Sequence, residues 1–337
     1  MRAVGHKACL PIQHAEALLD FETPTPVPGP RDLLVEIRAV SVNPVDTKVR
    51  QGLIPATGDW RILGWDAAGI VVAAGSETSL FKVGDEVFYS GALGRPGTNA
   101  QFHAVDERLV GAKPRSLTWA EAAALPLTSV TAWEALFDRL DVKKPVAGLK
   151  PSILIIGGAG GVGSISIQLA RQLTDLEIIA TASQPETQEW VRALGAHHVL
   201  DHSKPLDQEL AARGLAAPGF VFCTTHTDRH LAAIVELIAP QGRLCLIDDP
   251  ATLDIMPFKL KSISIHWELM YTRSLFQTPD MQAQHTILTE VSRLVDAGAI
   301  RTTLSETLGT INAANLKKAH ALLEAGHTKG KLVLEGF

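Results

Sequence analysis

The sequence predicts an α/β protein with two domains, a partly closed β-barrel and a parallel sheet covered by helices. Three observations support this prediction. A length of 337 residues is typical of about two domains. In the first ~120 residues, short apolar runs are separated by glycine and proline, as in a barrel or sandwich. From residue 119 onward, candidate strands and helices alternate, which favours right-handed βαβ units and a parallel sheet.

The first region holds three clear strands. In residues 34–42, apolar side chains alternate with Glu36 and Arg38, which is typical of a half-buried strand. Residues 70–74 form a second apolar run, and residues 86–89 follow a glycine turn. Short strands between such turns favour a partly closed barrel or a sandwich.

The second region is strongly periodic. Its runs ILII and LCLI are almost continuously apolar, which is typical of strands buried on both faces of a parallel sheet. We predict strands at 152–156, 177–182, 198–200, 219–223 and 243–247, and helices at 119–125, 129–140, 164–173, 186–194, 206–213 and 228–238. After these we predict a strand at 263–267, helices at 279–297 and 312–325, and a last strand at 332–334.

Composition and charge exclude several classes of protein. Hydrophobic residues make up 46% and charged residues 20%, which excludes a disordered chain or a coiled coil as a whole-chain description. Lys and Arg number 31 against 36 Asp and Glu, so the net charge is −5 and we expect no nucleic-acid partner. No apolar run reaches the ~18 residues of a membrane span, and the N-terminus shows no export signal. We therefore expect a cytoplasmic protein with no membrane partner.

The segment Gly157–Gly163, GGAGGVG, is the strongest motif. It follows a predicted strand and opens a predicted helix, which is the context of a dinucleotide-binding loop. Gly158 would permit the tight turn, Gly160 would let the backbone approach a pyrophosphate, and Gly163 would let the helix pack closely on the strand. We expect the whole loop to bind the cofactor, through Gly158, Ala159, Gly160, Gly161, Val162 and Gly163.

The end of the next strand indicates which nucleotide is bound. An NAD site usually carries an acid about 20 residues after the last glycine, where it holds the ribose 2′-hydroxyl. Here Ser183 stands at that position, and no acid occurs before Glu186. A small polar residue accommodates a 2′-phosphate, so we expect NADPH. His202, after the third strand, could donate to that phosphate, although a surface histidine in a loop is an equal alternative.

Six segments together are similar to the medium-chain dehydrogenase/reductase superfamily: SVNPVDTKVRQG, GWDAAGIVVAAG, VGDEVF, AAALPLTSVTAWEAL, GGAGGVG and LGAHHVLDH. The chain most resembles the quinone oxidoreductases, in particular the zinc-type alcohol dehydrogenase-like group. The resemblance implies a GroES-like catalytic domain at 1–126 and 263–337, with a doubly wound Rossmann domain for NADPH at 127–262. It also implies hydride transfer from NADPH and a homodimer.

The sequence departs from the zinc alcohol dehydrogenases at their metal ligands. Asn43 stands where those enzymes carry a cysteine, and Gly64–Trp65–Asp66 stands in place of Gly-His-Glu. Zinc prefers thiolate, imidazole or carboxylate ligands, and three scattered cysteines cannot form a four-cysteine site. His226 and His230 have a spacing that can share a metal, but two polar residues near a helix start are the simpler interpretation. We expect no metal.

Without a metal, a simple alcohol is a difficult substrate, because nothing stabilises the alkoxide from which hydride leaves. A quinone or an α,β-unsaturated carbonyl accepts hydride to give a delocalised oxyanion, which hydrogen bonds can stabilise. We therefore expect an NADPH-dependent, zinc-independent reductase of such acceptors. The alternatives are a zinc-type alcohol dehydrogenase and a non-catalytic sensor or structural protein that binds NADPH.

Further site residues follow from the resemblance and from strand ends. The resemblance implies that Asn43 reaches the nicotinamide ribose and the substrate carbonyl, and that Thr128 and Lys331 lie near the cofactor. For Lys331, a surface lysine is an equal alternative. Asp46 is either catalytic or a loop residue that fixes the backbone. The carboxyl ends of the fourth and fifth strands of the parallel sheet should flank the nicotinamide. The residues at these ends are Cys223, Thr224 and Ile247.

The chain has two tyrosines, which are candidates for the proton donor. We place Tyr89, in a barrel strand, among the catalytic candidates. Tyr271 lies in an aromatic stretch at 266–276 that could line a substrate pocket, form the dimer edge or pack in the core.

Overall fold

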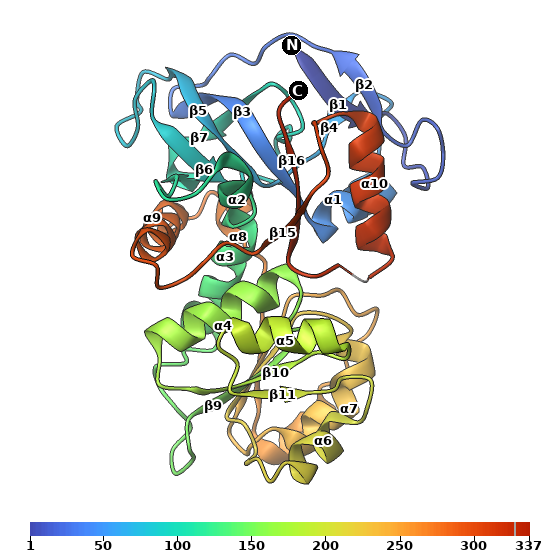
Figure 1. Ribbon diagram of the computed structural model, residues 1–337, viewed down its shortest axis with the longest axis vertical. Coiled ribbons are helices and arrows are strands. Elements are labelled where there is room, and N and C mark those ends of the chain that lie inside the picture. The colour runs from blue at the N-terminus through green and yellow to red at the C-terminus, as the bar shows by residue number, and fades with distance from the viewer. Residues whose placement is uncertain (327) are drawn as a thin grey trace. The chain divides into compact units, whose positions relative to one another are not determined.

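The computed structural model describes residues 1–326 and 328–337. The chain forms two compact units, Met1–Val130 with Tyr271–Phe337, and Thr131–Met270 (Figure 1). The predicted boundaries, 126/127 and 262/263, lie earlier in the chain than these. Helix α3 (Pro126–Trp133) spans the first boundary between the units. Strand β14 (Ser264–Trp267) pairs with β13 (Arg243–Leu246) and so belongs to the second unit. Within the described ranges, no helix is long and apolar enough to cross a membrane.

The first unit is built on two sheets. The smaller has the strand order β2-β1-β4, and the larger has the order β15-β16-β3-β5-β6-β8, with β7 also paired to β3. The strands are β1 (Arg2–His6), β2 (Leu19–Glu22), β3 (Asp32–Val42), β4 (Arg61–Ile62), β5 (Ala67–Ala74), β6 (Glu86–Tyr89), β7 (Phe102–Asp106), β8 (Val110–Ala112), β15 (Leu304–Thr307) and β16 (Lys331–Glu335). The long strand β3 is central, because it pairs antiparallel with β5, β7 and β16.

Five α-helices lie wholly within the first unit: α1 (Pro44–Lys48), α2 (Trp119–Ala123), α8 (Thr272–Phe276), α9 (Ala283–Asp296) and α10 (Ala313–Glu324). Helix α1 starts at Asn43, where Asp46 closes a capping box, and continues into a π-helix at Val49–Leu53. The predicted helix at 279–297 is shorter in the structure. Helix α8 ends at Phe276, the next residue Gln277 has a left-handed φ of 48°, and α9 begins only at Ala283.

The second unit is a six-stranded parallel sheet in the order β11-β10-β9-β12-β13-β14. Its further strands are β9 (Ser152–Ile156), β10 (Glu177–Thr181), β11 (His198–Leu200) and β12 (Phe220–Cys223). Its helices are α4 (Gly161–Leu173), α5 (Pro185–Ala193), α6 (Leu206–Ala212) and α7 (Thr227–Leu237), with a 3₁₀-helix at Met256–Lys261. Figure 1 shows α4 and α5 on one side of this sheet and α6 and α7 on the other. The predicted doubly wound parallel sheet is confirmed.

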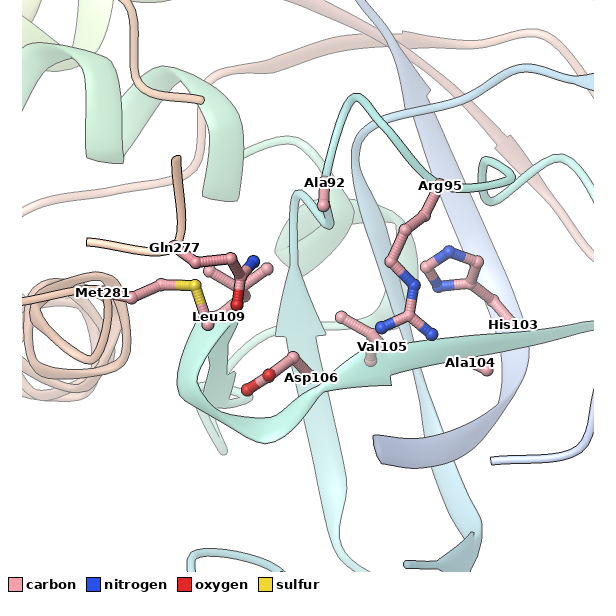
Figure 2. A pocket seen from close by; sticks show the side chains of 9 residues that line it. All are labelled: Ala92, Arg95, His103, Ala104, Val105, Asp106, Leu109, Gln277 and Met281. Atoms are coloured by element: carbon pink, nitrogen blue, oxygen red, sulfur yellow. The ribbon is translucent and has the colours of Figure 1, made fainter. Parts of the chain in front are cut away.

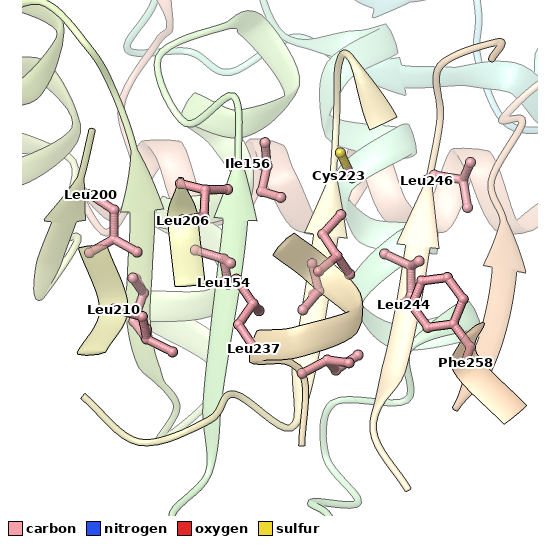
Figure 3. Packing of buried hydrophobic residues seen from close by; sticks show 14 residues of the cluster. Leu154, Ile156, Leu200, Leu206, Leu210, Cys223, Leu237, Leu244, Leu246 and Phe258 are labelled. Carbon is pink, nitrogen blue, oxygen red and sulfur yellow. The ribbon is translucent and has the colours of Figure 1, made fainter. Parts of the chain in front are cut away.

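The core of the second unit explains why these strands are so apolar. Leu154 and Leu244 lie on the strands either side of β12 and are fully buried in one cluster with Leu206 of α6 and Leu237 of α7 (Figure 3). Each buried leucine contributes roughly 1.5–3 kcal/mol relative to an exposed one. The strand order reverses between β9 and β12, so ligands are expected at the carboxyl ends of these two strands.

Candidate functional site

The glycine-rich turn joins β9 to α4 in the second unit. Gly157 has a left-handed φ of 82°, and a Cβ there would lie 2.4 Å from the hydroxyl of Thr224. A Cβ on Gly163 would lie 2.2 Å from the carbonyl oxygen of Gly157. Gly158 lies inside the tight turn that the N–H of Gly160 closes on the carbonyl oxygen of Gly157 at 3.2 Å, while Gly157 takes the left-handed conformation. Gly158 is small because its Cβ would approach Ala180 Cβ to 3.0 Å.

Gly160 is different, because the protein itself does not require glycine there. Its φ of −70° suits any residue, and a Cβ would meet only the carbonyl oxygen of Gly157, at 3.5 Å. It is the N-cap of α4, where backbone N–H groups have no partner within the helix. The turn therefore leaves room for a ligand's close approach, and the helix N-terminus favours an anionic one.

The hydroxyl of Thr181, the last residue of β10, connects this turn to His202. It accepts the N–H of Gly157 at 3.0 Å and lies 3.0 Å from Nδ1 of His202. Ser183 follows two residues later and is half-buried. The second-strand position therefore carries hydroxyl groups and no carboxylate.

The remaining predicted residues of the second unit follow β12 and β13. Cys223 is fully buried, and burial raises the pKa of its thiol to about 12, so it is a packing residue and not a nucleophile. The hydroxyl of Thr224 donates to the carbonyl oxygen of Ile156 at 2.8 Å. Ile247 directly follows β13 and is half-buried. These residues lie at the carboxyl ends of strands that flank the reversal point.

The first unit holds a buried charged cluster made of Asn43, Asp66 and Lys331. The ammonium of Lys331 donates to Asn43 Oδ1, to the carbonyl oxygen of Val42 at 2.9 Å, and pairs with Asp66 at 3.3 Å. Asn43 Nδ2 donates to Asp66 Oδ2 at 2.9 Å, and the backbone N–H of Leu127 donates to Asp66 Oδ1 at 2.8 Å. The cluster joins the end of β3 to the starts of β16 and α3.

Lys331 and Asn43 were predicted to contact the cofactor, and the structure gives their polar atoms other partners. The three N–H donors of Lys331 face three oxygen acceptors of the protein itself. Because a buried unpaired ammonium would be costly, we assign Lys331 to holding this cluster together. In the sequence, Asp66 is prominent only as part of the missing zinc motif, and no local pattern marks it as the carboxylate that pairs with Lys331.

The side chain of Asp46 lies next to this cluster, and its carboxyl group has fewer hydrogen bonds than that of Asp66. Its Oδ2 accepts the N–H of Asn43 at 2.7 Å, while its Oδ1 is buried with no hydrogen-bond partner. Burial raises the pKa of Asp46 to about 7 and that of Asp66 to about 6. The ammonium of Lys331 interacts electrostatically with the carboxyl groups of both Asp46 and Asp66. The cluster and Asp46 together are therefore neutral when Asp46 holds a proton and Asp66 does not.

The hydroxyl of Tyr271 is also buried without a partner, and it senses the charges of Asp46 and Asp66. Burial raises its pKa well above 10, so it keeps its proton. Tyr89 is placed elsewhere: its hydroxyl lies 3.1 Å from Nδ1 of His103, and the two rings stack. The structure therefore argues against Tyr89 as the proton donor, because its hydroxyl is committed to a buried histidine.

Thr128 is buried in α3, and its hydroxyl donates to the carbonyl oxygen of Leu125 at 3.1 Å. It follows directly after Leu127, whose N–H holds Asp66. The structure therefore places this predicted cofactor residue beside the charged cluster.

A small cavity of about 110 Å³ lies in the same unit. Figure 2 shows Arg95 and His103 at one end and Gln277 and Met281 at the other. Arg95 forms a bidentate pair with Asp32, both distances being 2.8 Å. Burial lowers the pKa of His103 to about 4, so the ring is neutral. With its arginine paired and its histidine uncharged, the cavity offers little to a charged ligand.

The residues at the expected zinc positions do not fit a metal. The amide of Asn43 is bonded on both sides, and Trp65 donates its indole N–H to the carbonyl oxygen of Ala92 at 3.3 Å. In the described part of the chain, no three His, Cys, Asp or Glu side chains are grouped as metal ligands. His226, one of the two histidines whose spacing could share a metal, is the N-cap of α7 and has a left-handed φ of 51°.

The chain is similar to known dehydrogenases and oxidoreductases over nearly its whole length. The alcohol dehydrogenase GroES-like domain family matches residues 29–132, and the zinc-binding dehydrogenase family matches residues 194–334. A zinc-type alcohol dehydrogenase-like protein of Staphylococcus aureus is 37% identical over 336 residues, or 99% of each chain. A Rhizobium etli structure, provisionally named a zinc-dependent alcohol dehydrogenase, is 65% identical with a TM-score of 0.98, covering 100% of this chain and 98% of that one. A Pseudomonas syringae quinone oxidoreductase structure is 25% identical with a TM-score of 0.82, covering 99% of both chains.

Proposed function

Because the chain belongs to the medium-chain dehydrogenase/reductase superfamily, in its zinc-type alcohol dehydrogenase-like group, we propose that it is an NADPH-dependent, zinc-independent reductase of quinones or α,β-unsaturated carbonyls. It is an oxidoreductase of this superfamily. The cofactor, the acceptor class and the site residues are the parts that we propose.

The turn between β9 and α4 is the observation that carries the cofactor assignment. The free space over Gly160 fits a pyrophosphate, and the first N–H groups of α4 would donate to it. Ser183 and His202 would hold the adenosine ribose and its 2′-phosphate, since no carboxylate stands there to repel a phosphate. Bound NADPH supplies a hydride to an electron-poor carbon. The residues after β12 and β13, Thr224 and Ile247, would hold the nicotinamide end.

The chemistry of the first unit favours an acceptor that needs a proton but no metal. Asp46 is near half-protonation at neutral pH, so its Oδ1 can hold and release one proton. Asn43 positions this carboxyl through its backbone N–H, while Lys331 balances the charge of Asp66. A quinone or enone oxygen that gains negative charge on reduction needs hydrogen bonds and a proton, which such a group can supply. We propose Asp46 as the proton store and Asn43 as a positioning residue.

We infer that the protein is a homodimer, formed through the exposed edge of the parallel sheet. Strand β14 ends the sheet order, so one of its edges has no partner strand within the described residues. Trp267, the last residue of β14, and Leu269 just after it are each 52% exposed, and Leu260 in the preceding 3₁₀-helix is 95% exposed. An unpaired strand edge beside exposed apolar side chains favours pairing with a second copy.

The activity is tested by initial rates of NADPH and NADH oxidation. The acceptors are an ortho-quinone, a para-quinone, an enal and a simple aldehyde, each with and without a chelator. We expect chelator-resistant turnover of quinone or enal, with NADPH preferred. Loss of activity in chelator, or turnover of simple aldehydes alone, would contradict the proposal. NADPH binding without any turnover would favour the sensor alternative.

A further inference from the structure

A cluster of histidines lies where β10 and β11 end in the second unit, and its role rests on the proposed NADPH binding. His202 is held there by Thr181, the last residue of β10. The same hydroxyl accepts the N–H of Gly157, so the Thr181 side chain ties the glycine-rich turn to His202 Nδ1. When the ring is protonated, both of its nitrogens carry a proton, and Nε2 is then a donor.

Two histidines of α7 complete this cluster. The ring centroid of His230 lies 6.4 Å from that of His202, and His226 interacts electrostatically with both. His226 holds a left-handed φ of 51° at the N-cap of α7, an uncommon conformation for a residue with a side chain. It is solvent-exposed, whereas His202 and His230 are half-buried. The histidines are therefore close together and within reach of a soluble ligand.

We propose that His202, His226 and His230 form the subsite for the 2′-phosphate of NADPH, and that binding of this phosphate is coupled to proton uptake by His202 and His230. The strand rule supports the location, because the ribose 2′ position is recognised at the end of the second strand of such a fold. That strand is β10, and His202 is bonded to its last residue. The preference for NADPH over NADH then depends on pH.

The charges around the cluster favour this coupling. Burial lowers the pKa of His202 and of His230, so both rings are mostly neutral at pH 7 without ligand. A phosphate dianion placed beside them favours the imidazolium form, so protons are taken up on binding. Arg229, next to His230, adds a fixed positive charge.

Three carboxylates also face this region. Asp201 raises the pKa of His202 and Asp228 raises that of His230, each as a smaller effect than burial. Asp201 is itself bonded to Ser203 at 2.7 Å. Asp248 is bound by the N–H of Thr227, at 2.8 Å, and by its hydroxyl, so it caps α7. Asp201 and Asp228 therefore favour the charged form of the two histidines, which is the form that attracts an anion.

The test compares two halves of the cofactor, 2′,5′-ADP and 5′-AMP, which differ in the 2′-phosphate. Calorimetric titrations at pH 7 in PIPES, HEPES and Tris measure the protons taken up on binding. We expect uptake with 2′,5′-ADP and little with 5′-AMP. We also expect the Kd for 2′,5′-ADP to rise about 10-fold from pH 6 to pH 8, as the histidines lose their protons, and that for 5′-AMP to stay within about 2-fold.

The variant His202→Gln/His230→Gln should lose the proton uptake and most of the affinity for 2′,5′-ADP. It should bind 5′-AMP as the wild type does, which shows that the turn remains folded. His14→Gln, an exposed histidine of the first unit, is the matched control and should change nothing. Equal proton uptake for both nucleotides, or an unchanged double variant, would overturn the assignment. Failure of the wild type to bind either nucleotide would instead contradict the proposed function on which this inference rests.

Discussion

At the scale of single residues, Gly160 and Gly163 differ in what a side chain would touch. We expect Gly163→Ala to lower the free energy of unfolding by about 1–3 kcal/mol, because its Cβ would overlap the Gly157 carbonyl. Gly160→Ser should fold normally, since serine is a favoured N-cap residue, but should weaken NADPH binding at least about 10-fold by filling the pyrophosphate space. Thermal unfolding and fluorescence titration measure the two effects. Normal NADPH affinity in Gly160→Ser would remove the main support for the cofactor site.

Asp46 gives a second prediction at this scale, from its pKa of about 7 in the folded chain against 3.8 as an ordinary value. Between these values the unfolded chain releases the proton and the folded chain keeps it, so this group destabilises the fold increasingly as pH rises from about 4 to 7. Asp46→Asn removes that contribution. The stability of the variant relative to wild type should therefore rise by on the order of 1 kcal/mol per pH unit between pH 5 and 7.

Denaturant unfolding at several pH values measures this difference. Asp59→Asn, at an exposed position, is the control and should show no such trend. A flat difference for Asp46→Asn would mean that the carboxyl is ionised throughout this range.

At the scale of elements, helix α10 is joined to the π-helix after α1 through a buried arginine. Arg50 is fully buried, donates to Glu324 of α10 and to the carbonyl oxygen of Leu10, and lies near His320, one turn before Glu324. His320 is buried with no hydrogen-bond partner on either ring nitrogen. Burial, with Arg50 as a further cause, lowers the pKa of His320 to about 3.

The low pKa of His320 makes the folded chain less stable in acid. Below pH 6.5 the unfolded chain binds a proton at this histidine and the folded chain does not, so stability is lost as pH falls from 6.5 towards 3. We expect His320→Leu to lose less stability than wild type between pH 6.5 and 4, by up to about 3 kcal/mol. Urea unfolding at both pH values measures the difference. Parallel losses in the two proteins would show that His320 does not titrate as described.

The secondary structure of the second unit is more predictable from the sequence than that of the first. The strands β9 and β11 have the predicted bounds, because apolar runs between turns signal strands buried on both faces. Strand β15, mostly exposed, has no such pattern and was missed, as was the short helix α8. The ion pair between Asp66 and Lys331 joins segments far apart in the chain, and no local pattern in the sequence encodes such a pairing.

At the scale of the whole molecule, the predicted dimer can be tested on the exposed residues beside β14. We expect Leu260→Lys to shift the protein from dimer to monomer in sedimentation velocity, because it places a charge in an apolar contact. Val27→Lys, at an apolar position of the first unit that is 88% exposed, is the control and should leave the dimer intact. A wild-type protein that sediments as a monomer would contradict the dimer itself.

The first unit is assembled from both ends of the chain, and this has a consequence for synthesis on the ribosome. The second unit, Thr131–Met270, is complete when residue 270 emerges and can fold while translation continues. The central strand β3 must wait for β16, which is made almost last, and the carboxylate of Asp66 lacks its ammonium until residue 331 appears. A nascent chain stalled before that residue therefore carries a finished parallel-sheet unit together with an open sheet edge in the other unit, and an unpaired strand edge favours aggregation.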